Sequence, residues 1–489
     1  MRKTLSITLA VAAMAAAVVP AASASPSSAD SMNTVQWGPC PADVTAPELQ
    51  CSTIKVPLDY RKPDGPKIDL AISRLPSTNP AHRRGVLLTN PGGPGGEGLD
   101  YPQILSWVKL PASVRDAYDV IGFDPRGVGH SAPVTCDLTA AQKAFGNFPR
   151  YANDQADITK AAEEAKTLAK QCATSKTASM LPYITTANSA RDMDQIRVAL
   201  GERKLSYLGY SYGTYLGAVY TTMFPQRSDR IVLDSNMGPG GYDFTAMRNF
   251  ALGLQDRFPD FAKFAAANPK YGLGSTPEQV SAKFYELAAR LKKTPVDGVD
   301  DNGFRGLTFA SLYGSDYAYL AGAWHDLDTN QPVPPPSGAP ANPPDPDNLS
   351  SSRLYTICGD SRWPRTIPAY QAAVAVDRVR YPMLGASTAN VSPCAYWPSD
   401  PVEPPVRIGD HGPSNVLMVQ NLRDPGTPLA GALKTRQALG DRARMVTVDQ
   451  GGHGVYLVTH NQCANDTVTA FLATGGRPAH DLACAAQPS

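Results

Sequence analysis

The sequence carries almost no excess charge of either sign. Its 489 residues include 45 Lys and Arg against 44 Asp and Glu, which gives a formal net charge of +1 at pH 7. Without a basic field to attract phosphates, we expect no nucleic-acid partner. After the N-terminal segment there is also no run of about 18 apolar residues, so we expect no stable membrane association of the mature chain.

Signals for metals and cofactors are missing as well. The chain has no Cys-x-x-Cys pair, and its cysteines do not cluster with its histidines, so we expect no zinc site. Its one glycine-rich loop lacks the Lys-Ser or Lys-Thr of a phosphate-binding loop. The sequence therefore predicts a protein without metal or cofactor.

The composition is typical of a globular enzyme. Hydrophobic residues make up 42% of the chain and charged residues 18%. The length exceeds the size at which one hydrophobic core stops growing, so we expect two lobes or one large α/β core with a substantial insertion. We expect the protein to be a monomer.

The N-terminus has the pattern of a secretory signal peptide. Two basic residues precede an apolar stretch over residues 5–19, and Ala22-Ser23-Ala24 is a small-residue cleavage site. We predict a signal peptide over 1–24, cleaved near Ala24, and a flexible leader or short pro-segment over 25–35. The protein is then secreted; an uncleaved membrane anchor is the alternative.

The even number of cysteines fits export, because disulfides form in oxidising compartments. Eight cysteines can pair in many ways, and the simplest pairing joins neighbours in the sequence. That pairing gives Cys40–Cys51, Cys136–Cys172, Cys358–Cys394 and Cys463–Cys484. The alternative is that some of the cysteines are free buried thiols.

Short apolar runs that alternate with helical patterns predict a mostly parallel sheet with helices on both faces. The runs at 85–90 and 118–124 are continuously apolar, as is typical of parallel strands covered on both sides. Further strands are expected at 53–58, 67–73, 204–210, 230–234, 415–420 and 443–448, and helices at 189–200, 212–224, 429–439 and 466–472.

The alternation stops over residues 236–404. We predict that this segment is a lid (cap), inserted into a core formed by residues 36–235 and 405–489. Its proline-rich stretch at 331–346 cannot form a regular strand or helix and predicts an extended connector or lid loop. Helical patterns within the insertion lie at 256–267 and 276–291.

The motif richest in chemical information is Gly209-Tyr210-Ser211-Tyr212-Gly213. It lies where a predicted strand ends and a predicted helix begins. A nucleophile on such a strained turn needs small neighbours, because side chains at the two glycine positions would clash with nearby backbone. We therefore predict Ser211 as the nucleophile of a serine hydrolase and the N–H of Tyr212 as an oxyanion donor.

A serine nucleophile needs a general base and a carboxylate that orients the base. In enzymes with this motif, the order along the chain is Ser, then Asp or Glu, then His. Asp424 follows the strand predicted at 415–420, and His453 follows the one at 443–448, which we expect to be the final strand. We predict that Asp424 and His453 complete the triad, with Asp449 as the alternative acid.

A loop with five glycines, Asn90 to Gly98, directly follows the strand predicted at 85–90. Accessible N–H groups in such a loop supply the second oxyanion donor. The turn after the next strand contains Asp124 and Arg126. We expect these two charged side chains to lock the loops around the site rather than to react.

Together these motifs resemble the prolyl aminopeptidase family of α/β-hydrolases, and most of all its branch of secreted actinobacterial tripeptidyl aminopeptidases. The similarity covers nearly the whole mature chain, including Cys358 before Asp360 in the insertion. The matching motifs are Gly92-Gly93-Pro94-Gly95-Gly96, Asp124-Pro125-Arg126-Gly127, Gly209 to Thr214, Asp424 to Pro428, Gly452-His453-Gly454 and Cys394 to Trp397.

The resemblance implies an α/β-hydrolase fold with a mostly parallel central sheet and a large, mainly helical lid. Transferred to this sequence, it implies Ser211, Asp424 and His453 as the catalytic residues and the N–H groups of Gly93 and Tyr212 as the oxyanion hole. It also implies release of short peptides, often tripeptides, from free N-termini, with lid carboxylates that hold the substrate ammonium.

We therefore predict a secreted serine exo-peptidase that acts on peptide substrates through an acyl-enzyme. A carboxylesterase with the same triad is the alternative, because fold and triad do not fix the acyl substrate. A catalytically inactive binding protein is disfavoured, since all three triad positions are filled. Glu97 stands where many relatives carry serine, and we expect it to be an exposed glutamate rather than a ligand of the substrate amine.

Overall fold

The computed structural model describes residues 35–44, 46–143, 148–336 and 345–487. The predicted signal peptide, and all but the last residue of the predicted leader, lie outside this range. Among the described residues, no helix combines the length and the apolar character needed to cross a membrane.

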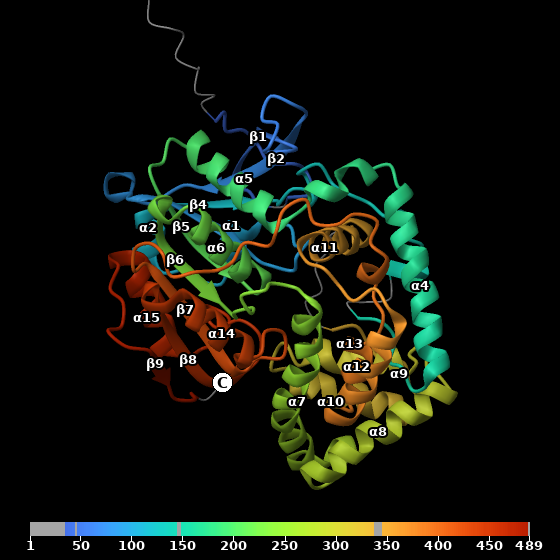
Figure 1. Cartoon of the computed structure of the whole chain (residues 1–489). Coiled ribbons are helices and arrows are strands. Elements are labelled where there is room, and N and C mark those ends of the chain that lie inside the picture. The colour runs from blue at the N-terminus through green and yellow to red at the C-terminus, as the bar shows by residue number, and fades with distance from the viewer. Residues whose placement is uncertain (1–34, 45, 144–147, 337–344, 488–489) are drawn as a thin grey trace, which may run out of the picture. The chain divides into compact units, whose positions relative to one another are not determined.

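Within these residues, nine strands form one sheet (Figure 1). β1 pairs with β2, and β2 with β4, in antiparallel orientation, whereas all other neighbours pair in parallel. The mostly parallel sheet predicted from the sequence is confirmed. The strands are, in spatial order, β1 (Gln50–Pro57), β2 (Lys67–Leu75), β4 (Tyr118–Phe123), β3 (Gly85–Asn90), β5 (Leu205–Tyr210), β6 (Ser228–Asp234), β7 (Val416–Arg423), β8 (Ala443–Gly451) and β9 (Leu482–Cys484).

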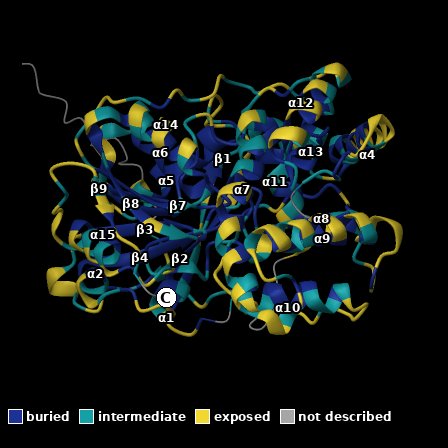
Figure 2. Cartoon of the chain, turned by 90° about the horizontal axis from the view of Figure 1, so that it is seen from below, coloured by how far each residue is buried: buried dark blue, intermediate teal, exposed yellow. Residues whose placement is uncertain are grey.

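Helices cover both faces of the sheet, which is why strands β3, β4 and β5 are buried along their whole length. Alternate strand residues serve opposite faces: Leu87 belongs to one hydrophobic cluster, and its neighbours Val86 and Leu88 belong to the other. Figure 2 shows the buried sheet between helices that expose their outer sides. One face carries α1 (Tyr101–Trp107), α2 (Ala112–Ala117) and α15 (Gln462–Thr474), and the other α5 (Thr186–Ala199), α6 (Tyr212–Met223) and α14 (Leu429–Leu439).

The segment between β6 and β7 is helical, as the sequence predicts. The proline-rich stretch has no regular structure over residues 331–336, residues 337–344 lie outside the described range, and Pro346 is the first residue of a helix. We propose residues 236–404 as the lid and residues 36–235 with 405–489 as the core. The main helices of the insertion are α7 (Phe244–Ala267), α8 (Pro277–Lys293), α9 (Asp301–Ser311), α10 (Tyr317–Asp328), α11 (Pro346–Asp360), α12 (Ile367–Arg380) and α13 (Gly385–Thr388).

Two predicted boundaries are wrong. The strand at 443–448 is not the final one, because the three-residue strand β9 pairs with it in parallel and is joined to α15 by the Cys463–Cys484 disulfide. Helix α7 begins at Phe244 rather than at 256, since the Asp243 side chain caps it by accepting a hydrogen bond from the N–H of Ala246, 2.7 Å away. Strand β9 has only three residues, which is shorter than the runs of about four to eight residues from which a strand is predicted.

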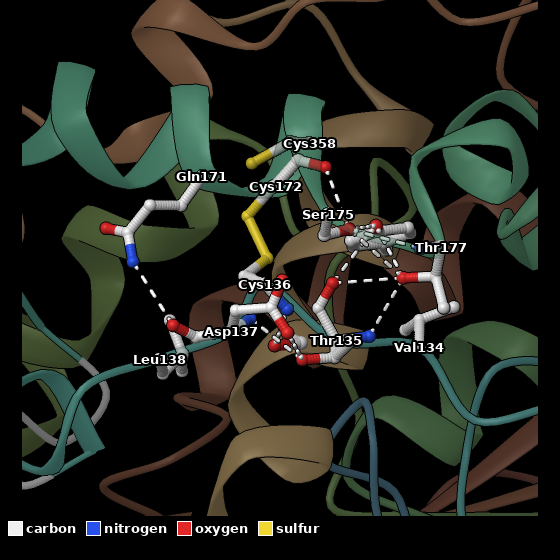
Figure 3. Close-up of a disulfide and its surroundings, with 12 residues drawn as sticks. Val134, Thr135, Cys136, Asp137, Leu138, Gln171, Cys172, Ser175, Thr177 and Cys358 are labelled. Carbon is white, nitrogen blue, oxygen red and sulfur yellow. Dashed lines mark hydrogen bonds between the residues drawn. A yellow bond between two sulfur atoms is a disulfide. The ribbon is translucent and has the colours of Figure 1, made fainter.

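One helix of the first segment packs on the insertion. Helix α4 (Gln155–Thr174), which the sequence reasoning missed, shares a hydrophobic cluster with α12. The Cys136–Cys172 disulfide joins its last turn to the segment after Val134, and the Gln171 amide donates to the carbonyl of Asp137 (Figure 3). All four disulfides pair sequence neighbours as predicted, and no free cysteine is found.

Candidate active site

Ser211 lies at the turn between β5 and α6. Its backbone has φ 57° and ψ −124°, in the left-handed region that a residue other than glycine rarely adopts. A Cβ added at Gly209 would lie 2.6 Å from the carbonyl oxygen of Gly213, and one added at Gly213 would lie 2.9 Å from that of Asn90. The two glycines are thus required for close backbone approach, and the serine side chain projects from a strained turn.

Asp424 and His453 are brought together by the loops that follow β7 and β8. Nδ1 of His453 lies 2.9 and 3.0 Å from the two carboxylate oxygens of Asp424. The buried carboxylate also accepts hydrogen bonds from the N–H of Gly426 and from the N–H and hydroxyl of Thr427, at 2.8 to 3.0 Å. These contacts fix the orientation of Asp424, and Asp424 in turn fixes the imidazole.

The imidazole of His453 is enclosed by Tyr313 from the insertion. The N–H of His453 donates to the carbonyl of Tyr313 at 2.7 Å, and the two rings meet edge to face with centroids 4.7 Å apart. Burial lowers the pKa of His453, but the charge and hydrogen bond of Asp424, together with the charge of Asp234, raise it, so that the pKa lies above the usual 6.5. The pair therefore has the geometry of a general base with its orienting acid.

The alternative acid, Asp449, does not contact His453. Its side chain is 56% exposed, and it forms a salt bridge with Nη1 of Arg423 at 2.6 Å. Within the described part of the chain, no hydrogen bond links Oγ of Ser211 to the imidazole of His453. The structure brings Asp424, not Asp449, to the histidine.

Asp234 and Ser235, at the end of β6, connect the turn at Ser211 (the serine turn) by hydrogen bonds to the loop that carries His453 (the histidine loop). The N–H of Ser211 donates to the carbonyl of Asp234 at 2.9 Å. The Asp234 carboxylate accepts from the N–H groups of Val455 at 2.9 Å and Tyr456 at 2.7 Å. Burial raises the pKa of Asp234 to about 7. Sequence reasoning missed these two residues, although polar side chains directly after a buried strand could have pointed to them.

The glycine-rich loop lies against the serine turn. A Cβ added at Gly92 would lie 2.5 Å from the carbonyl oxygen of Tyr210 and 2.9 Å from Cβ of Ser211. Tyr212 is the first residue of α6, so its N–H has no carbonyl of a preceding helical turn to bond. The loop that contains Gly93 thus lies beside the serine turn, and the role of Gly93 and Tyr212 as oxyanion donors stays a prediction.

The predicted locking role of Asp124 and Arg126 is confirmed. The Asp124 carboxylate accepts from the N–H groups of Gly98 at 2.7 Å and His130 at 2.9 Å, which joins two loops beside the site. Arg126 is buried and forms a bidentate ion pair with Asp192 at 2.6 and 2.7 Å. Both groups are saturated with structural partners.

Glu97 is partly buried, so its predicted exposure is wrong. A Cβ added at Gly129 would lie 3.0 Å from Cγ of Glu97, which shows that the neighbouring turn covers this side chain. Burial, and next the charge of Asp124, raise the pKa of the Glu97 carboxyl. This packing could not be predicted from the sequence, because Gly129 comes from a different loop.

Helices of the insertion contact the loops of the site. A Cβ added at Gly253 of α7 would lie 2.4 Å from the carbonyl oxygen of Pro425, next to Asp424. Residue Asp360, at the end of α11, accepts from the N–H and hydroxyl of Thr186, and that hydroxyl bonds the phenol of Tyr212 at 2.5 Å. The insertion is therefore in contact with the acid loop and connected to the residue after Ser211.

Comparison with known proteins supports the same architecture. The family model described as TAP-like protein matches residues 381–484. The chain is 37% identical to the tripeptidyl aminopeptidase of Streptomyces coelicolor, over 92% of this chain and 86% of that protein. It is 29% identical to the serine protease Hip1 of Mycobacterium tuberculosis, over 92% and 91% of the two chains. With carboxylesterase B of M. tuberculosis the identity is 30%, over 89% and 86%.

An identity of 37% that extends across both the sheet and the insertion exceeds what a shared fold alone produces. The strand order, the serine turn after β5 and the acid and histidine after β7 and β8 agree with that relationship. The chain belongs to the tripeptidyl aminopeptidase family of α/β-hydrolases and is a serine hydrolase.

Proposed function

We propose that the protein is a secreted exo-peptidase that releases short peptides, tripeptides in particular, from the free N-terminus of its substrates. The observation that carries this proposal is the similarity to a tripeptidyl aminopeptidase over 92% of the chain, which includes the insertion over the site. Fold and triad alone do not choose the acyl substrate, whereas the groups around them do. The four disulfides support export to an oxidising compartment.

In the proposed reaction, Oγ of Ser211 attacks the carbonyl carbon of the scissile peptide bond while Nε2 of His453 takes its proton. Asp424 holds the imidazole through Nδ1 and stabilises the imidazolium. The negative charge on the substrate oxygen is stabilised by the N–H groups of Gly93 and Tyr212.

The intermediate collapses when the C–N bond breaks and His453 gives its proton to the leaving amine. The acyl group then remains as an ester on Ser211. Water attacks this ester while His453 takes its proton. The C–Oγ bond then breaks, His453 returns the proton to Oγ of Ser211, and the N-terminal peptide leaves with a new carboxyl end. The strained turn presents Oγ of Ser211 to the substrate in the first step and its ester to water in the second.

One comparison tests the proposed substrate. Hydrolysis of Ala-Ala-Ala 4-nitroanilide with a free amine is measured beside its N-acetylated form. If the site binds the substrate ammonium, acetylation removes a paired charge and is expected to lower kcat/KM by about 100-fold or more. Equal rates on the two substrates would reject the aminopeptidase assignment.

A carboxylesterase is the second candidate, favoured by the similarity to carboxylesterase B. Including 4-nitrophenyl butyrate in the same assay separates the two. Rapid hydrolysis of the ester with no detectable cleavage of either peptide would establish the esterase and exclude the peptidase. We expect the free tripeptide anilide to be cleaved.

A further inference from the structure

Helix α11 of the insertion lies directly on the glycine-rich loop. A Cβ added at Gly95 would lie 2.6 Å from Oγ of Ser352 and 2.7 Å from the carbonyl oxygen of Leu349. The core fixes the helix there, since the amide of Asn348 donates to two core carbonyls at 2.9 Å and accepts from the N–H of Gly129. The residues that α11 presents beside the site are thus held in place.

Arg353, the next residue after Ser352, lies over the ring of Tyr242. Its guanidinium carbon lies 5.2 Å from the centre of the Tyr242 ring. Burial raises the pKa of Tyr242 and of Tyr313; the charge of Arg353 lowers both and the charge of Asp424 raises both. The two phenols therefore lie within electrostatic reach of both Arg353 and Asp424, and Tyr313 packs on the ring of His453.

One nitrogen of the partly buried Arg353 side chain has no acceptor. Its Nη2 atom is buried and makes no hydrogen bond, and no salt bridge joins Arg353 to a carboxylate within the described ranges of the chain. A guanidinium only donates, and a buried donor without an acceptor is unfavourable. The phenols of Tyr242 and Tyr313 stay protonated at neutral pH, because burial raises the pKa of each, so they can donate as well. This donor set lacks its anion.

We propose that Arg353, together with the phenols of Tyr242 and Tyr313, binds a carboxylate of the substrate beside the bond that Ser211 attacks. A guanidinium matches a carboxylate in bidentate geometry, which gives selectivity as well as affinity. The proposal rests on the proposed function, since it takes the substrate to be a peptide. The carboxylate has two sources: an Asp or Glu side chain next to the scissile bond, or the C-terminus of a short leaving peptide.

Matched substrates distinguish the two sources. Ala-Ala-Glu and Ala-Ala-Gln 4-nitroanilides differ only in the side-chain charge, and Ala-Ala-Ala-Ala and its C-terminal amide differ only in the terminal charge. In at least one pair, the wild-type enzyme is expected to cleave the charged member with a kcat/KM about 10- to 100-fold higher, as a charge-assisted hydrogen bond allows. No preference in either pair would overturn the proposal.

The variant Arg353→Gln assigns the preference to this residue. Its ratio between charged and neutral substrate is expected to fall to about 1, whereas Arg353→Lys, which keeps the charge, retains part of it. As a matched control, Arg365→Gln changes an exposed lid arginine paired with Asp400, and its ratio should equal that of the wild type. A preference that persists in a folded Arg353→Gln enzyme would contradict the proposal.

Failure of the proposed function would be recognised separately. If the wild-type enzyme cleaves no peptide but hydrolyses aryl esters, the exo-peptidase proposal is wrong. The subsite is then tested with 4-nitrophenyl hydrogen glutarate against 4-nitrophenyl pentanoate, which differ in one carboxylate. The same preference, lost in Arg353→Gln, supports the subsite, and its absence rejects it.

Discussion

The carboxyl edge of the sheet and the helical insertion contribute different things to the site. At the edge, the buried carboxylates are fully bonded: Asp424 accepts three hydrogen bonds from its own loop besides the contact to His453, and Asp234 accepts from Ser235 and the histidine loop. In the insertion, Arg353 keeps a buried donor without an acceptor. The two carboxylates at the sheet edge thus use their oxygens to hold the loops of Ser211 and His453, whereas Arg353 keeps a donor for the carboxylate that we propose it binds.

The largest expected loss follows from Ser211→Ala, which removes the proposed nucleophile. We expect kcat on Ala-Ala-Ala 4-nitroanilide to fall by about 10⁶-fold, as in other serine enzymes. The thermal unfolding midpoint should stay near that of the wild type, since only one hydroxyl is lost from the turn. An enzyme that kept its activity would show that the chemistry does not reside at the sheet edge.

The next loss is expected for Asp424→Asn, at about 10⁴-fold in kcat, because the amide holds the wrong imidazole tautomer. The Asp424 charge raises the pKa of His453, and the base acts only when neutral, so wild-type activity falls as the pH drops through that raised pKa. In the variant, the acidic limb of the pH–rate profile should move to lower pH.

The matched control is Asp449→Asn. This carboxylate is exposed and pairs with Arg423 rather than with His453, so its variant should retain nearly wild-type kcat and pH profile. If the two variants behaved in the opposite way, Asp449 would be the acid and the present assignment would be wrong.

A smaller loss of activity is expected for Asp234→Asn, which weakens the hydrogen bonds that connect the serine turn to the histidine loop. An amide oxygen cannot accept every bond that the carboxylate accepts from Ser235, Val455 and Tyr456, so we expect kcat to fall by about 10- to 100-fold with KM little changed. If kcat fell only in proportion to the amount of folded enzyme, Asp234 would have a structural role only.

The same variant tests whether Asp234 contributes to the pH dependence of stability. Burial raises the pKa of Asp234 to about 7, above its unfolded value, so its contribution to stability is present at low pH and is lost as the pH rises through about 7. Urea unfolding of the wild type at pH 5 and pH 8 should show this loss, and Asp234→Asn should reduce it. Identical pH dependence in both proteins would contradict the raised pKa.

The smallest effect on chemistry is expected from the disulfides. Cys358–Cys394 in the insertion closes a sequence separation of 36, and Cys40–Cys51 beside β1 closes one of 11. Replacing both cysteines of each bond by serine should lower the free energy of unfolding by about 4 and about 3 kcal/mol, respectively, by loop-closure entropy. Denaturant titration measures the two losses in unfolding free energy. A larger loss for Cys40–Cys51 would show that strain in the native state or residual structure in the unfolded state outweighs loop-closure entropy.

The sequence predicted best those features that depend on a few neighbouring residues. Helix α14 over Leu429–Leu439 and strand β3 over Gly85–Asn90 lie where the sequence predicts them, because Pro428 and Gly440 bound the helix and the strand is a short apolar run that ends before Pro91. The serine turn is recognised by its glycines, whose spacing is required by backbone contacts. Asp424 and His453 were found because both come directly after predicted strands, and the carboxyl ends of parallel strands meet at one edge.

Other features depend on segments far apart in the chain. The buried residues of helix α4 recur at helical spacing, but most of them are small alanines, and the partner that covers them is the distant helix α12. Tyr313 meets His453 only because the insertion folds back onto the β8 loop. Glu97 is partly covered because the turn at Gly129 comes close to it. Contacts between segments that are far apart in the chain leave no pattern in the local sequence.

By itself, the sequence determined the mostly parallel sheet, the disulfide pairs between neighbouring cysteines and the position of Ser211, Asp424 and His453 at strand ends. These features follow from periodicity, from short loop closure and from backbone sterics, all of which act over a few residues. Only the tertiary structure brought Asp424 rather than Asp449 to His453, joined Ser211 to the histidine loop through Asp234, and left Nη2 of Arg353 without an acceptor among the described residues. Those outcomes depend on which side chains meet across the fold, because hydrogen bonding and charge pairing are decided by distance in space.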